Sequence, residues 1–258
     1  MADFFVTGDD KRWDLVAKML REAGHRVYRE GLPTEKAGVC LPGFGTAKKD
    51  VLALAKALPA GSTVFLGRAD GEERAALKER GIFAIPLLED EEYLAQNARA
   101  TAEGCLAALI ECTDSLLEKE RVLLCGYGNC GRAIAALFRQ NGIRLSVFSR
   151  EGSMARAARE GFEVYRAPGD EMGRFSTLVN TVPEPIFPPA FLDAIPRGTH
   201  FFQVASGFSG LSVTSLEKRG ILFHPLPGLP GLCAPGSEAA AIFGCIRKHL
   251  DQFFHESE

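Results

Sequence analysis

A glycine-rich stretch, GYGNCG at positions 126–131, has the spacing of a turn that binds the phosphates of a nucleotide. It follows the apolar run VLLC and precedes a helix-like run, which is the setting that such a turn requires. Gly126 would allow a tight turn, Gly128 would let the backbone approach a pyrophosphate, and Gly131 would let the helix pack on the strand. The free N–H groups at the start of the helix attract phosphate. The predicted cofactor-binding residues of this stretch are Gly126, Tyr127, Gly128, Asn129, Cys130 and Gly131.

Ser149 and Arg150, at the end of the next predicted strand, indicate which dinucleotide would bind. NAD-selective sites carry an acidic residue there, which accepts hydrogen bonds from the adenosine ribose. Here the first acid after the turn is Glu151, whereas a hydroxyl and a guanidinium would bind a 2′-phosphate through charge-assisted hydrogen bonds. The sequence therefore predicts NADP. Two alternatives stay open: a turn without a ligand, and S-adenosylmethionine, which has no 2′-phosphate and would leave Arg150 unexplained.

Polar residues at the ends of other predicted strands could contact the reacting groups. Arg12 follows the first strand at the start of a helix, where α/β proteins bind ligands, and could hold an anionic substrate. Ser206 would flank the reacting ring, but no His–Asp pair at a motif spacing supports a nucleophilic role. His224 could act as a general base, although a structural role is favoured. The residues expected beside the nicotinamide end are Thr181, Val182, Pro183 and Ala205.

Strand-like and helix-like runs alternate along the chain, which is typical of an α/β protein with parallel sheets. Runs such as DFFVTG and DLVAKMLREAG predict a small doubly wound domain over residues 1–98. A long helix over 98–117 would lead to a second domain, residues 99–236, which holds the glycine-rich turn. A final helix over 237–258, with Ser237 as its N-cap, would pack back on the first domain. The predicted fold is therefore α/β, with two Rossmann-like domains, parallel sheets and an interdomain cleft.

The composition argues against several classes of function. The net charge of −3 provides no basic surface for nucleic acid or for a membrane, and no apolar run is long enough to span a bilayer. The 7 cysteines form no CxxC pair and the 5 histidines show no HxxxH spacing, so no metal site is predicted. Cysteines in apolar surroundings are typical of reduced thiols, and we expect a cytoplasmic protein.

Four short strings along the chain together resemble one enzyme family. The string PGLPGLCAP (227–235) is the most specific, and TAEG (101–104), NTVP (180–183) and GDDKR (8–12) support it. They are similar to the A subunit of dipicolinate synthase, and the resemblance extends over nearly the whole chain. It implies an NADP-dependent oxidoreductase that converts dihydrodipicolinate to dipicolinate during spore formation. It also implies a small dicarboxylate substrate and a partner that is a flavoprotein-like B subunit, and a homo-oligomer stays open.

The resemblance also suggests roles for individual residues. It implies that Thr101 and Glu103 reach the cleft, although the residues alone would also fit a helix N-cap and a favourable acid at a helix start. The chain departs from the family at Gln203, where an Asp is expected, and at Gly207 and Gly236, where basic residues are expected. Two cations that could hold a dicarboxylate are thus missing. The predicted catalytic residues are Arg12, Thr101, Glu103 and Ser206.

Two other functions fit parts of the sequence. One is an NADP-dependent dehydrogenase of another small hydroxy or oxo acid, which the fold would permit, although no Arg–Glu–His set at a recognisable spacing supports it. The other is a non-catalytic, cofactor-binding partner that positions or regulates a second subunit. The missing cations favour this last interpretation.

Overall fold

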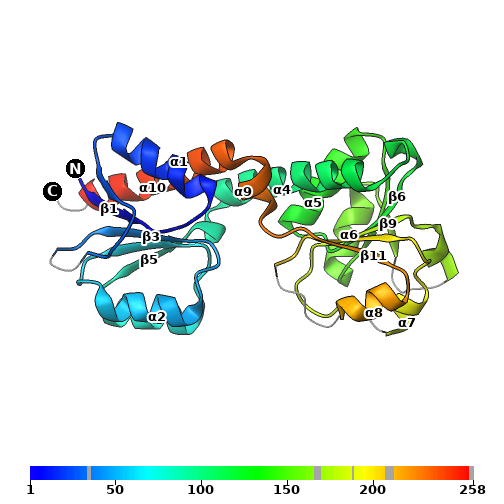
Figure 1. Cartoon of the computed structure of the whole chain (residues 1–258), viewed down its shortest axis with the longest axis horizontal. Coiled ribbons are helices and arrows are strands. Elements are labelled where there is room, and N and C mark those ends of the chain that lie inside the picture. The colour runs from blue at the N-terminus through cyan, green and yellow to red at the C-terminus, as the bar shows by residue number, and fades with distance from the viewer. Residues whose placement is uncertain (34–35, 166–169, 188, 207–211, 256–258) are drawn as a thin grey trace. The chain divides into compact units, whose positions relative to one another are not determined.

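The chain forms two compact units, each built on a parallel sheet (Figure 1). The computed structural model describes residues 1–33, 36–165, 170–187, 189–206 and 212–255. Unit 1 comprises Met1–Gln96 and Ala234–Glu258, and unit 2 comprises Asn97–Cys233. The predicted fold class, α/β with two Rossmann-like parallel-sheet domains, is confirmed. The cleft between the domains stays a prediction.

Unit 1 contains a five-stranded sheet whose strands are all parallel. The strands are β1 (Asp3–Val6), β2 (Arg26–Tyr28), β3 (Val39–Gly43), β4 (Thr63–Leu66) and β5 (Phe83–Pro86). Their order in the sheet is β2-β1-β3-β4-β5, the flavodoxin-like order of doubly wound proteins. The strand order reverses between β1 and β3, so the loops that follow these two strands lie at the usual ligand-binding edge.

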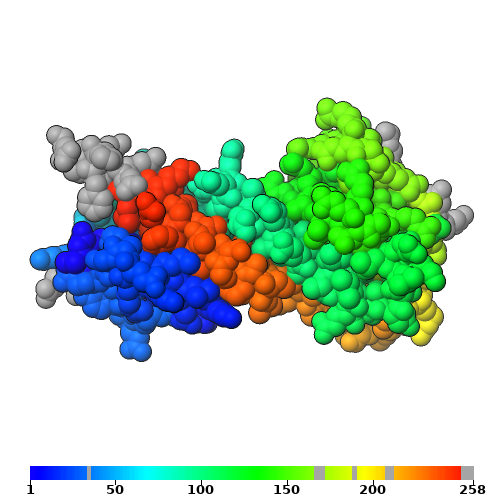
Figure 2. Space-filling model, turned by 90° about the horizontal axis from the view of Figure 1, so that it is seen from above, coloured from blue at the N-terminus to red at the C-terminus, as the bar shows by residue number. Residues whose placement is uncertain are grey.

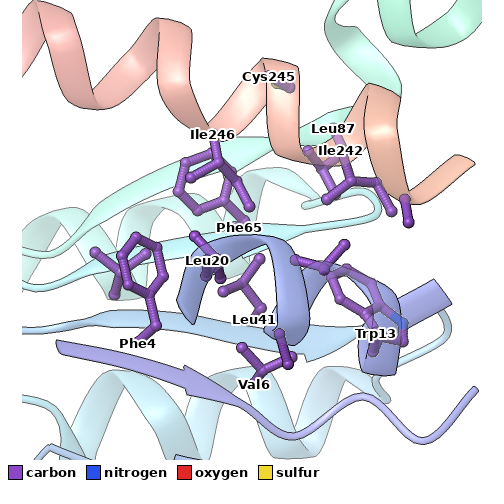
Figure 3. Packing of buried hydrophobic residues seen from close by; sticks show 14 of the residues in the cluster. Phe4, Val6, Trp13, Leu20, Leu41, Phe65, Leu87, Ile242, Cys245 and Ile246 are labelled. Carbon is purple, nitrogen blue, oxygen red and sulfur yellow. The ribbon is translucent and has the colours of Figure 1, made fainter. Parts of the chain in front are cut away.

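Helices cover both faces of this sheet (Figure 1). They are α1 (Lys11–Glu22), α2 (Lys48–Ala57), α3 (Gly71–Glu79), the 3-10 turn η1 (Leu87–Glu89), the first part of α4 (Glu91–Cys112) and α10 (Pro235–His255). Helix α10 packs along α1 on the face opposite α2 (Figures 1 and 2). Between these two helices and the sheet lies a buried core that includes Phe4, Trp13, Phe65, Ile242 and Ile246 (Figure 3). The last segment of the chain thus completes the core of the first unit.

Two helices begin earlier than the sequence predicts. Helix α10 begins at Pro235, so Ser237 lies in its first turn and the predicted N-cap is wrong. Helix α4 begins at Glu91 because Asp90 accepts a hydrogen bond of 2.9 Å from the backbone N–H of Tyr93, which caps the helix. Thr101 therefore lies in the middle of α4, and its alternative role as an N-cap is wrong.

Unit 2 contains a six-stranded parallel sheet. The strands are β6 (Arg121–Cys125), β7 (Arg144–Phe148), β8 (Glu163–Tyr165), β9 (Thr177–Asn180), β10 (His200–Gln203) and β11 (Leu222–Pro225). Their order is β11-β10-β9-β6-β7-β8, which is the 3-2-1-4-5-6 order of dinucleotide-binding sheets read from the opposite edge. The order reverses between β6 and β9, and the glycine-rich stretch directly follows β6.

The helices of unit 2 complete the doubly wound pattern. They are the rest of α4, the 3-10 turns η2 (Leu117–Lys119) and η3 (Asp170–Arg174), α5 (Asn129–Gln140), α6 (Glu151–Arg159), α7 (Pro189–Asp193), α8 (Val213–Lys218) and α9 (Leu229–Cys233). Helix α5 buries Ile134, Ala135 and Phe138, so its apolar face holds it against the sheet. Among the residues that the structure describes, no helix is both long and apolar enough to cross a membrane.

Candidate functional site

The glycine-rich stretch forms a tight turn between β6 and α5, and two of its glycines, Gly126 and Gly131, stand where a side chain would clash. Gly126 has a φ of +99°, and a Cβ there would lie 2.4 Å from Oγ1 of Thr181. A Cβ on Gly131 would lie 2.4 Å from the carbonyl oxygen of Gly126, so helix and turn touch at this point. At Gly128 a Cβ would meet no atom within 4 Å. The turn is therefore closely packed at its two ends and open in its middle, where a phosphate would approach.

The first turn of α5 presents backbone N–H groups beside this open space. Its N-cap is Gly128, and no side chain caps the helix there. Asn129 is exposed, Cys130 is half-buried and Gly131 is buried. Because the first N–H groups of a helix have no partner within the helix, this end can bind an anion such as a phosphate.

The side chain of Tyr127 points away from the open turn. It is 4% exposed and belongs to the core of unit 2, and its ring meets the edge of Phe162. Its hydroxyl donates a hydrogen bond of 2.6 Å to Oε2 of Glu160, at the end of α6. Burial and this carboxylate raise the pKa of Tyr127. Only the backbone of Tyr127 is therefore available to a ligand, while the side chain anchors the turn.

Ser149 and Arg150 follow the strand next to the turn. The backbone N–H of Gly126 donates to the carbonyl oxygen of Phe148 over 2.8 Å, which holds the ends of β6 and β7 side by side. Ser149 is half-buried, and Arg150 is exposed at the N-cap position of α6. Within the described part of the chain, no side chain pairs with the guanidinium of Arg150. Because it is exposed, this guanidinium could bind an anion such as a phosphate.

The loops after β9 and β10 adjoin the same edge of the sheet. Thr181 donates to the carbonyl oxygen of Cys125 through both its backbone N–H (2.9 Å) and its hydroxyl (3.0 Å). Pro183 and Ser206 are exposed, and Ala205 is half-buried. The cofactor-binding residues predicted from the sequence are thus gathered at the carboxyl ends of neighbouring strands in unit 2. Gly207, where the resemblance leads us to expect a basic residue, lies outside the described residues.

Asn180 and Gln203 form a buried pair of amides that sequence reasoning did not find. They are 3% and 6% exposed, and Nδ2 of Asn180 donates to Oε1 of Gln203 over 2.9 Å. In the sequence, Gln203 stands out only as a departure from the family. A signal was present, because both residues are amides at the ends of neighbouring strands, but the register that pairs them was not evident from the sequence.

Arg12 lies in the first turn of α1 in unit 1, and its side chain is buried against Asp10, the N-cap residue of that helix. Its side chain is 9% exposed, and its guanidinium forms a salt bridge of 2.5 Å with Asp10 and lies over the ring of Phe44. Asp10 also accepts from the backbone N–H of Arg12 at the start of α1. Burial alone would raise the pKa of Asp10, but the hydrogen bonds and charge of Arg12 outweigh it and lower that pKa. The positive charge of Arg12 is therefore already balanced.

The other residues singled out from the sequence have different surroundings. Thr101 is 4% exposed and donates its hydroxyl to the carbonyl oxygen of Asn97 over 2.8 Å, within its own helix. Glu103 is exposed on the same helix. Nε2 of His224 lies 2.9 Å from Nδ1 of His200, and Nδ1 of His224 lies 3.6 Å from Sγ of Cys112. Burial, and after it the neighbouring His200, lower the pKa of His224. The catalytic roles of Arg12, Thr101, Glu103 and Ser206 stay predictions.

Comparisons with known proteins show what this chain is similar to. Residues 116–188 match the family model of the acetohydroxy acid isomeroreductase NADPH-binding domain. The A subunit of dipicolinate synthase of Bacillus subtilis (strain 168) is 27% identical over an alignment of 199 residues. The alignment covers 74% of this chain and 66% of that protein, just under two thirds of its length. The predicted resemblance to this family is therefore confirmed.

Solved structures show the same fold over almost the whole chain. The A chain of dipicolinate synthase from Bacillus subtilis has a TM-score of 0.81 and 20% identity, covering 99% of this chain and 97% of that one. The A subunit of the enzyme from Bacillus halodurans has a TM-score of 0.83 and 21% identity, covering 96% and 98%. A transhydrogenase from Sinorhizobium meliloti is more distant, with a TM-score of 0.65 and 13% identity, covering 97% and 93%.

Proposed function

From the likeness of this chain to the A subunit of dipicolinate synthase, we propose that it binds NADP in unit 2 and oxidises dihydrodipicolinate to dipicolinate in spore formation. The observation that carries the proposal is the glycine-rich turn after β6, which is open at Gly128, together with the exposed Arg150 that follows the neighbouring strand β7. The match of residues 116–188 to an NADPH-binding domain supports the cofactor. The relative is named as one subunit of a synthase, which supports a partner, and for this partner we propose a flavoprotein-like B subunit.

The residues of unit 2 have distinct proposed tasks in holding the cofactor. Backbone N–H groups of residues 127–131 bind the pyrophosphate, and Ser149 and Arg150 bind the 2′-phosphate. The loops that contain Thr181 and Ala205 hold the nicotinamide end. The bound cofactor supplies a hydride acceptor, and loss of a hydride and a proton makes the substrate ring aromatic. The chain's own contribution is to bind and orient both reactants.

The substrate is a small dicarboxylate in this proposal, held by Arg12 with Thr101, Glu103 and Ser206 near the ring. Because Arg12 is paired with Asp10, binding a substrate carboxylate requires the guanidinium to be shared between two anions. The same pairing favours a second candidate function, a cofactor-binding protein that supports a catalytic partner without catalysis of its own. Production of dipicolinate, followed by its ultraviolet absorbance with and without the partner, separates the two. Product at the uncatalysed rate in both mixtures would rule out the catalytic role.

Selectivity for the 2′-phosphate tests the cofactor assignment directly. We expect the wild type to bind NADP more tightly than NAD, and Arg150→Ala to weaken NADP binding by about tenfold to a hundredfold, as for loss of a charge-assisted hydrogen bond of roughly 1.5–3 kcal/mol. NAD binding should not change. Isothermal titration with both cofactors measures this. Arg159→Ala, which removes an exposed arginine of the same helix, is the matched control. Equal wild-type affinity for the two cofactors would contradict the assignment.

A further inference from the structure

We infer that Asn180 and Gln203 are positioning residues for the nicotinamide half of the cofactor. They would act by holding Val182 and Ala205, in the segments that directly follow β9 and β10, without contacting the ligand themselves. The inference rests on the proposed binding of NADP in unit 2. It goes beyond that proposal because it assigns the ordering of one half of the cofactor site to a specific pair of buried side chains.

The pair lies at the carboxyl ends of two neighbouring strands. Asn180 is the last residue of β9 and Gln203 is the last residue of β10, and the two residues are partners in the register of the sheet. Both are buried, so the hydrogen bond of 2.9 Å between their side-chain amides is shielded from water. Removing the partner of a buried amide therefore destabilises the protein far more than removing the partner of an exposed amide.

Each side chain turns back to the loop that it precedes. Oδ1 of Asn180 accepts from the backbone N–H of Val182 over 3.1 Å, and its Nδ2 donates to the carbonyl oxygen of Val182 over 3.0 Å. Nε2 of Gln203 donates to the carbonyl oxygen of Ala205 over 3.0 Å. The backbone carbonyl of Asn180 also accepts from the N–H of Ala205 over 3.1 Å. The amide pair therefore joins both loops into one hydrogen-bonded network.

The side chain at position 203 has to accept one hydrogen bond and donate another in this network, and the amide of glutamine does both. Gln203 accepts from Asn180 with its oxygen and donates to the carbonyl of Ala205 with its nitrogen. A carboxylate accepts but does not donate, and it would face the carbonyl oxygen of Ala205 with a negative charge. A thioether of similar length fills the space but donates nothing. Gln203→Glu and Gln203→Met therefore break the network in two different ways.

The phosphate turn is held by other contacts. The backbone N–H of Gly126 donates to the carbonyl oxygen of Phe148 over 2.8 Å, and a Cβ on Gly131 would lie 2.4 Å from the carbonyl oxygen of Gly126, so the start of α5 packs closely against the turn. A ligand that carries only the adenosine and phosphate groups should therefore not depend on Gln203. A ligand that also carries nicotinamide should depend on it. A purely structural role for Gln203 would affect both ligands alike.

The experiment compares NADP with adenosine 2′,5′-bisphosphate, which lacks the nicotinamide half. Isothermal titration of the full chain should show NADP affinity about tenfold lower in Gln203→Met and in Gln203→Glu. The affinity for the bisphosphate should stay within about twofold of the wild type. Gln140→Met, which changes an exposed glutamine at the end of α5, should alter neither affinity.

Each other outcome has a definite meaning. Equal losses for the two ligands, or no loss for either, would overturn the positioning role while leaving the proposed function standing. If one variant does not fold, as judged by thermal unfolding without ligand, the other still decides the question. A wild-type chain that binds neither ligand would overturn the proposed function, and the inference with it.

Discussion

At the scale of single residues, the glycines of the turn differ in what they tolerate. Gly131→Ala places a Cβ against the backbone of Gly126, which cannot move aside as a flexible side chain can. We expect this change to lower the free energy of unfolding by roughly 1–3 kcal/mol, as overpacking does. Gly128→Ala enters open space at a φ of −81°, which alanine adopts without strain. It should leave the stability unchanged and weaken NADP binding, because the Cβ fills the place of the pyrophosphate.

Thermal unfolding without ligand and titration with NADP measure these two effects separately. Gly152→Ala is the control, because a Cβ there also meets nothing within 4 Å but lies outside the turn. A Gly128→Ala variant that binds NADP like the wild type would show that the open middle of the turn is not where the phosphates lie.

The candidate site could be predicted from the sequence where the reasons are local. The glycine spacing and the strand–turn–helix setting are local patterns, and the turn has the predicted form. The sequence predicts Arg12 as a cation that could hold a substrate, whereas its side chain is buried against Asp10 and Phe44. The hydrogen bond between Asn180 and Gln203 joins residues that are far apart in the chain. Partners of this kind depend on strand register and on burial, which no local pattern contains.

At the scale of elements, the alternation of strand-like and helix-like segments was sufficient to predict the class of fold, but it did not predict the ends of the helices. The start of α4 is set by Asp90, whose side chain accepts two hydrogen bonds. It accepts from the backbone N–H of Tyr93, and it accepts from Nζ of Lys248 on α10 over 2.9 Å. The second bond joins two segments that are far apart in the chain, so a short window of sequence could not show it.

This double role of Asp90 makes its replacement measurable. Asp90→Ala should lower the free energy of unfolding at pH 7 by about 1–2 kcal/mol, as loss of an N-cap does. Burial alone would raise the pKa of Asp90, but the bonds from Lys248 and the backbone outweigh it and lower that pKa. Its stabilising effect is therefore present above the unfolded pKa and is lost as the pH falls through the folded pKa.

Urea unfolding of Asp90→Ala and wild type from pH 7 to pH 3 measures this effect. The difference in the free energy of unfolding between the two proteins should become smaller as the pH falls. The exposed Glu92, which lies two residues after Asp90, provides the control Glu92→Ala, which should have a small effect. A difference that stays constant with pH would show that the carboxylate charge contributes nothing.

At the scale of the whole molecule, each unit has core clusters of its own. Those of unit 1 include residues of α1 and α10, and those of unit 2 include residues of β6, α5 and β10. Because local opening follows such cooperative units, the two can differ in their free energies of opening. A ligand that binds only unit 2 should therefore stabilise that unit selectively.

Hydrogen exchange of buried strands tests this expectation. NADP at a free concentration of about 100 times its Kd should raise the opening free energy of β6 and β9 by about 2.7 kcal/mol. The strands β1 and β4 of unit 1 should change little, because no cofactor contact is proposed for them. Arg150→Ala at the same NADP concentration is the control, and its protection of β6 should be smaller. An equal rise in both sheets would show instead that the two units open together, since a ligand held by one unit can protect the other only when their unfolding is coupled.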